Sequence, residues 1–160
     1  MNQDVEQVWG IPRSVMELEI GNFQGFLPAQ RPLFESCRNL EPLGSFRDRP
    51  QAEEDAQWKQ LIPYVCILHE GSMLVLQRLK TQGEKRLHGK RSIGVGGHVN
   101  PEEPGDTPLL FRGLQRELSE EIGLIPDAAE CRFLGWINDD ETAGGQVHLG
   151  LAVAVQVHLA

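Results

Sequence analysis

The most informative stretch of this 160-residue sequence is Arg116-Glu117-Leu118-Ser119-Glu120-Glu121-Ile122-Gly123-Leu124. At about 100° of rotation per residue, the apolar residues of this stretch and of the turns before it gather on one face of a helix. The pair Thr107-Pro108 suits the start, because threonine caps free amides and proline fits the first turn. Gly123 suits the end as a C-terminal cap. The sequence therefore predicts an amphipathic helix from Thr107 to Gly123 that packs on a core.

Three carboxylates share one side of this helix, because Glu117, Glu120 and Glu121 are three and four residues apart. On the helical wheel Glu117 and Glu121 overlap the edge of the apolar stripe, and Glu121 points most nearly toward the core. A solvated acidic face, paired with Arg112 and Arg116, is one interpretation. The overlap with the stripe favours another, because a buried carboxylate needs compensation. A hard divalent cation such as Mg²⁺ binds oxygen ligands, neutralises phosphate and activates water.

The charge of the chain supports a local site. The formal net charge is −8, and residues 102–141 hold eleven acids against three bases, which accounts for all of it. Residues 78–91 are basic instead, and from them we expect phosphate-binding groups at Arg78, Lys85, Arg86, Lys90 and Arg91. A solvated loop is the alternative for this basic segment. An acidic total argues against a nucleic-acid-binding surface.

Composition sets the class of protein. With 40% hydrophobic and 24% charged residues, the chain is typical of a globular protein of one domain, with or without an extension. Its apolar runs are too short to cross a bilayer, and the polar N-terminus is unlike a signal peptide. The three cysteines have no spacing typical of disulfides or zinc sites, so we expect a cytoplasmic protein.

Strands are expected on both sides of the helix. Residues 6–11 form a possible strand, Ser14 is a candidate helix cap, and residues 21–32 are read as a loop with Phe23 and Phe26 anchored in the core. The other expected strands are residues 61–69 with 72–77 as a hairpin, 92–99, 131–137 and 146–159. The last has a period of two, with Val147, Leu149, Leu151, Val153, Val155, Val157 and Leu159 on one face. The glycines at 144–145 are read as loop. This order of elements predicts a mixed α/β or α+β domain.

The quoted stretch resembles the second half of the Nudix box, whose pattern is Arg-Glu-aliphatic-any-Glu-Glu-any-Gly-aliphatic. Gly97, five residues and Glu103 resemble its first half. Twelve residues then precede Arg116 where the family has seven, so the box carries a five-residue insertion. By resemblance Glu103 would pair with Arg116. Residues 60–64 and 83–90 are also similar to a bacterial subgroup described as predicted MutT-type phosphoesterases.

The resemblance implies an α/β/α sandwich with a mixed sheet over residues 59–160, and an N-terminal extension, residues 1–58, packed on it. It implies an enzyme that uses Mg²⁺ or Mn²⁺ to cleave the pyrophosphate bond of a nucleoside diphosphate linked to another moiety. Glu117, Glu120, Glu121 and the carbonyl of Gly97 would hold the metal, and Arg116 would orient the carboxylates. Glu120 is the first candidate for the catalytic base, and an acid of the loop 139–141 is the second.

Two other functions are compatible with the resemblance. One is a Nudix-fold module that binds a nucleotide metabolite without cleaving it, and the intact Glu120-Glu121 pair argues against this. The other is an isomerase of isoprenoid diphosphates, which would need a reactive cysteine or acid in the pocket; no cysteine lies near the box in the sequence, although Cys131 could approach it in space. His98 and His148 are read either as substrate donors or as structural histidines.

The expected last strand ends the chain, whereas Nudix domains usually continue into a helix that packs on the sheet. Its apolar face would then be covered by the extension, by a second subunit in a homodimer, or by further chain. The expected partner is a small nucleoside diphosphate derivative, with no membrane and no nucleic acid.

Overall fold

The structure is a computed structural model that describes residues 4–77, 90–102 and 104–158. Its centre is an eight-stranded sheet in the order β2-β9-β10-β4-β1-β3, and β5 and β8 also pair with β4. The pair β10–β4 is parallel and the others are antiparallel. The sheet is therefore mixed, and the expected α+β fold is confirmed.

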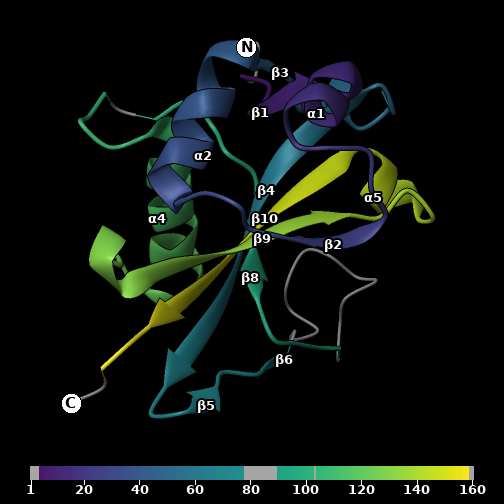
Figure 1. The fold of residues 1–160 in the computed structure, drawn as a ribbon. Coiled ribbons are helices and arrows are strands. Elements are labelled where there is room, and N and C mark those ends of the chain that lie inside the picture. The colour runs from purple at the N-terminus through teal and green to yellow at the C-terminus, as the bar shows by residue number, and fades with distance from the viewer. Residues whose placement is uncertain (1–3, 78–89, 103, 159–160) are drawn as a thin grey trace.

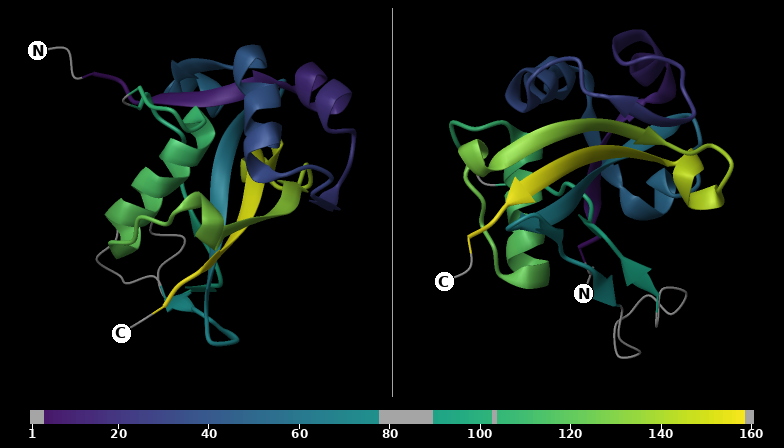
Figure 2. Two further views of the ribbon diagram at one scale, coloured as in Figure 1. Left: turned by 60° about the vertical axis from the view of Figure 1, so that its left-hand side comes forward. Right: turned by 60° about the horizontal axis from the view of Figure 1, so that its bottom comes forward.

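The strands are β1 (Gln7–Pro12), β2 (Gly25–Pro28), β3 (Ser45–Asp48), β4 (Trp58–His69), β5 (Ser72–Met73), β8 (Val95–Gly96), β9 (Cys131–Asn138) and β10 (His148–Gln156), and β6 (Leu76–Gln77) pairs with β7 (Arg91–Ser92) in a separate ribbon. The helices are α1 (Arg13–Glu19), α2 (Leu33–Leu40), α3 (Arg49–Ala52), α4 (Leu109–Ile122) and α5 (Ala143–Gln146), with short 3₁₀ turns η1 (Glu41–Leu43) and η3 (Ala128–Glu130). Strands β4, β9 and β10 run side by side through the middle of the molecule (Figures 1 and 2).

The main core lies on one face of the sheet. Alternate residues of β10 enter it, and α1, α2 and α4 cover them from outside. Phe34 of α2 packs on Phe111 of α4, with ring centroids 5.0 Å apart. The β10 members of this core are Leu149, Leu151, Val153, Val155 and Val157. The apolar face of the last strand is thus covered within this chain, in part by side chains that precede residue 58, such as Met16 and Leu40.

A smaller apolar cluster lies on the other face. It consists of Val8 from β1, Trp58 from β4 and Ala52 from α3. Val8 and Trp58 alternate with residues that face the main core, as the period of two along a strand requires. Helix α3 therefore covers the end of the sheet where β1 and β4 meet.

Helix α4 ends as expected, but it begins differently. Gly123 adopts the left-handed conformation (φ 71°), and its N–H donates to the carbonyls of Leu118 and Ser119. The expected cap by Thr107 is wrong, because Pro108 occupies the capping position and offers no side-chain oxygen. The free amide of Leu110 instead donates to Glu41 Oε1 at 3.1 Å. A residue of η1 thus satisfies the start of α4.

Four local expectations are also corrected. Residues 21–32 are not all loop, since they contain the edge strand β2, and Phe26 is 54% exposed instead of buried. Leu27 packs against the core, and successive side chains of a strand point to opposite faces, so its neighbour Phe26 points away from the core. Ser14 lies inside α1 and does not cap it. The glycines at 144–145 belong to α5, which Thr142 caps by accepting from the Gly145 amide.

The expected strand 92–99 is shorter than predicted. It consists of the two-residue strands β7 and β8 with a bend between them. Among the described residues, no helix is long and apolar enough to cross a membrane.

Candidate active site

Arg116 is the centre of a polar cluster at the middle of α4. Its guanidinium donates to Glu102 Oε1 at 2.5 Å, to Glu120 Oε2 at 2.9 Å and, more weakly, to Glu117 Oε1 at 3.4 Å. It also donates to the carbonyl of His98 and to Asn100 Oδ1, both at 2.8 Å. One arginine therefore ties α4 to the segment after β8.

Glu117 packs directly against the backbone of Gly97. A Cβ atom at position 97 would overlap the Glu117 carboxylate and displace it from this position. The side chain of Glu117 is 15% exposed. Burial raises the pKa of Glu117. The nearby carboxylates of Glu120 and Glu121 raise this pKa further, and the positive charge of Arg116 opposes the shift. The carboxylate thus lies beside a backbone segment in a setting that disfavours its charge.

The other two carboxylates of the helix are more open. The side chain of Glu120 is 59% exposed, and Glu121 is exposed as well. The helical wheel therefore selected the wrong residue as the most buried one. It describes direction around the axis, but Glu121 lies in the last turn of α4, whereas Glu117 lies beside Gly97.

The charges of this cluster do not balance. Arg116 contacts three carboxylates, from Glu102, Glu117 and Glu120, and it can neutralise only one of them. A divalent cation would compensate this excess, and its hard-oxygen preference matches the ligands present. The Glu117 carboxylate occupies the room that Gly97 leaves, so it lies against the Gly97 backbone.

Comparison with known proteins places the chain. No family model matches it. Protein YmaB of Bacillus subtilis (strain 168) is 36% identical over 156 residues, which cover 95% of this chain and 76% of YmaB. The chain belongs to the YmaB family. The crystal structure of Tm1382, described as "a putative Nudix hydrolase", is 34% identical with a TM-score of 0.77, and the match covers 94% of this chain and 76% of that one.

The likeness to Tm1382 gives this member of the YmaB family a Nudix-like fold, and that fold indicates a hydrolase. The nine residues that resemble the Nudix box form the C-terminal half of α4 and its cap. Gly97, from the first half of the same box, lies against Glu117 of the second half. The two halves of the motif are therefore adjacent in space although an insertion separates them in the sequence.

The acid expected to pair with Arg116 cannot be compared directly with the acid that pairs with it among the described residues. The resemblance assigned this role to Glu103, which lies outside the described residues. In the structure Glu102 makes the ion pair with Arg116, and its side chain is 13% exposed. Asn100 is a second partner that the sequence did not indicate. The only signal for Glu102 was its place next to Glu103.

The basic segment is described only in part. Arg78, Lys85 and Arg86 lie outside the described residues. Lys90 and Arg91 are exposed, and Arg91 is in β7.

The acidic loop at 139–141 lies at the far end of β9 from α4 (Figure 1). Asp140 accepts from Arg13 at 2.7 Å, from Lys59 Nζ at 2.8 Å and from Asn138 at 3.0 Å. Arg13 and then Lys59 hold the pKa of Asp140 well below its usual range. A carboxylate that is held so firmly ionised is a poor proton acceptor, which disfavours it as the catalytic base.

The cysteine considered for isomerase chemistry is half-buried at the start of β9. Burial raises the pKa of Cys131 to about 11, with Glu130 and Asp127 nearby. A thiol in this setting stays protonated and unreactive at neutral pH.

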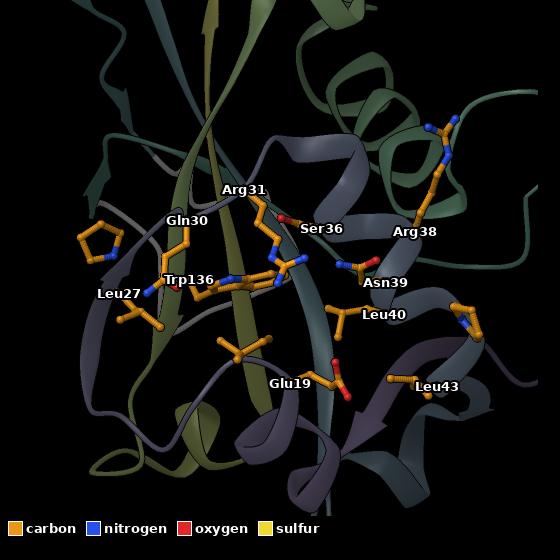
Figure 3. Close-up of a pocket in the computed structure, with 13 residues that line it drawn as sticks. Glu19, Leu27, Gln30, Arg31, Ser36, Arg38, Asn39, Leu40, Leu43 and Trp136 are labelled. Carbon is orange, nitrogen blue, oxygen red and sulfur yellow. The ribbon is translucent and has the colours of Figure 1, made fainter.

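A pocket of about 600 Å³ opens between α1, β2, α2 and β9 (Figure 3). Trp136 forms part of its wall, and Arg31, Arg38, Asn39 and Glu19 contribute polar groups. None of the carboxylates around Arg116 lines it. The pocket is therefore separate from the candidate active site.

Proposed function

We propose that this chain is a hydrolase that depends on Mg²⁺ or Mn²⁺ and cleaves the pyrophosphate bond of a nucleoside diphosphate linked to another moiety. The observation that carries the proposal is the contact between the Glu117 carboxylate and the backbone of Gly97, within a cluster where acids outnumber Arg116. The Nudix-like fold of the relative Tm1382 supports it.

Glu117, Glu120, Glu121 and the carbonyl of Gly97 are the groups that would hold the metal. When bound, such an ion shares the negative charge of a diphosphate and makes water a better nucleophile. Glu117 is the anchor in this proposal, because it is the least exposed carboxylate of the three and touches the glycine backbone.

Arg116 acts here as a positioning residue. Its bonds to Glu117 and Glu120 fix two carboxylates on one side of α4, and its bond to Glu102 fixes the guanidinium itself. Glu120 is open to solvent, so water can reach its carboxylate, and we assign it the role of general base. Cations of the basic segment, Lys90 and Arg91 among them, are proposed to bind the phosphates of the substrate.

The test is an assay with Mg²⁺ on nucleotide sugars, dinucleotide polyphosphates, ADP-ribose, coenzyme A and nucleoside triphosphates, with products resolved by chromatography. We expect turnover of at least one compound, its loss on chelation, and its loss in Glu121→Gln without loss of the folded state. Glu17→Gln, an exposed acid of α1, is the matched control and should keep full activity. Equal activity in Glu121→Gln would overturn the metal assignment. Binding without turnover for every compound would favour the non-catalytic module instead.

A further inference from the structure

A second group of potential metal ligands lies on the α3 side of the sheet. It consists of Glu53, directly after α3, His98, two residues after β8, and His148, the first residue of β10. One ligand atom from each residue lies within 4.8 Å of the others. None of the three belongs to the carboxylate cluster around Arg116, and three distant parts of the chain supply them.

The geometry is close to that of a shared ion. His98 Nε2 is 3.9 Å from Glu53 Oε1, and the two imidazole rings meet edge to face with centroids 5.7 Å apart. Ligand atoms around a tetrahedral Zn²⁺ are about 3.3 Å apart, since each lies 2.0–2.1 Å from the ion. Side-chain movements of roughly one ångström would therefore bring all three ligands to an ion. Two imidazoles and one carboxylate are a ligand set that Zn²⁺ takes, with a fourth position left for water.

The surroundings of this group contain buried polar atoms without partners. Gln60 is fully buried, and neither its amide nitrogen nor its amide oxygen has a hydrogen-bond partner. Gln60 is the register partner of His148 on the neighbouring strand, so the two side chains share one face. Nε1 of Trp58 and Nε2 of His98 are also buried and without hydrogen-bond partners. Such atoms are costly to bury; an ion would take up the lone pair of His98 Nε2, and the water in its fourth position would donate to an acceptor such as Gln60 Oε1.

The local charge suits a divalent cation. Arg49 donates to Glu6 Oε2 at 2.9 Å and to Glu53 Oε1 at 3.1 Å, so the two acids and one arginine leave one negative charge. A carboxylate ligand is commonly held by a further hydrogen bond of this kind. Glu53 is the open side of the group, since 37% of its side chain is exposed, and an ion can enter there.

We propose that Glu53, His98 and His148 form a binding site for a transition-metal ion of the zinc class, separate from the carboxylates of α4. The site would join α3 to β10 and to the segment after β8. It does not rest on the proposed hydrolase function. Because the carbonyl of His98 accepts from Arg116, the ion would also hold the segment that contacts the candidate active site.

The test is a titration of the full chain with Zn²⁺ in competition with a chromophoric chelator, repeated with Co²⁺ to record its visible spectrum. We expect one tight Zn²⁺ per chain and a Co²⁺ spectrum typical of nitrogen and oxygen ligands. His148→Ala and Glu53→Gln should each weaken this binding by at least about 10-fold. Because Glu53 is exposed, we expect Glu53→Gln to fold, so it can test the site even if His148→Ala does not fold.

Two controls separate the site from other sources of binding. His158→Ala, an exposed histidine near the end of the described chain, should bind Zn²⁺ like the wild type. Glu117→Gln should also retain the tight site, which distinguishes it from the α4 cluster. Absence of tight binding in the wild type would overturn the proposal and leave ordered water as the partner of these atoms. Unchanged binding in both His148→Ala and Glu53→Gln would overturn it as well.

Discussion

Two charged clusters of this molecule are built from similar residues and differ in balance. Around Arg116, one cation contacts three carboxylates. At the other end of β9, one carboxylate, Asp140, contacts two cations, Arg13 and the fully buried Lys59. The second cluster is satisfied by its own hydrogen bonds to Asn138 and to the carbonyl of Gly145. Among the described residues the first cluster has an excess of negative charge, and the second joins loop, helix and strand.

The comparison predicts that the α4 cluster can be changed with a large effect on activity and little on stability. Glu117→Gln should reduce turnover by on the order of 100-fold or more, because the proposed metal loses its anchor. Its thermal unfolding should stay the same or move upward, since burial already disfavours the charge of Glu117. Steady-state kinetics and calorimetry measure the two effects. A lowered unfolding temperature with unchanged turnover would make this cluster structural.

The Asp140 cluster should respond in the opposite way. Asp140→Asn leaves Lys59 buried without its counter-charge, and we expect a loss of about 2 kcal/mol in the free energy of unfolding, reduced by the partial exposure of Asp140. Urea unfolding measures this loss, and Asp4→Asn, an exposed acid, is the control. Adding Lys59→Met to Asp140→Asn should recover part of the stability. An unchanged free energy of unfolding in Asp140→Asn alone would show that the Asp140 cluster does not stabilise the fold.

A third substitution asks which acid holds Arg116. Glu102→Gln removes its shortest contact, and we expect turnover to fall about 10-fold, as for other residues that orient metal ligands. The motif spacing selects Glu103, so Glu103→Gln is the matched variant, and it should have the smaller effect. A larger loss of turnover in Glu103→Gln than in Glu102→Gln would indicate that Glu103 is the acid that holds Arg116, as the motif spacing predicts.

The smallest effect concerns pH. Arg13 and Lys59 lower the pKa of Asp140 below its ordinary value of 3.8, so its contribution to stability is complete above that value and is lost as the pH falls further. The difference in unfolding free energy between wild type and Asp140→Asn should therefore be constant from pH 7 to about 5 and shrink below about pH 4. Urea unfolding across this range measures it. A difference that grows toward low pH would contradict the assignment.

The elements that the sequence predicted well are those with strong local signals. Helix α4 has an apolar stripe and a terminal glycine, and large apolar residues alternate with small or polar ones along β10. Strand β2 was missed because its four residues carry no such signal, and it exists through its pairing with β9. Thr107 was a reasonable cap by residue type, but Glu41, distant in sequence, takes that role.

The candidate site shows the same limit. The acids of α4 could be found because helical spacing fixes their common side. The partner of Arg116 could not, because residues 101–102 and 104–108 lie outside helices and strands, where spacing in the sequence does not fix the direction of a side chain. The group of Glu53, His98 and His148 was beyond reach for a further reason, since its members are distant in sequence and meet only through the pairing of β4 with β10 and the position of α3.

The pairing of β2 with β9 also bears on how the chain is made. Gly25 is in register with Asn138, more than 100 residues later. At a synthesis rate of roughly 5–20 residues per second, β2 leaves the ribosome on the order of ten seconds before its partner exists. During this time its strand edge and the exposed Phe26 are open to other chains. A newly made chain would therefore be most prone to aggregation, and most in need of a chaperone, just before its last two strands emerge.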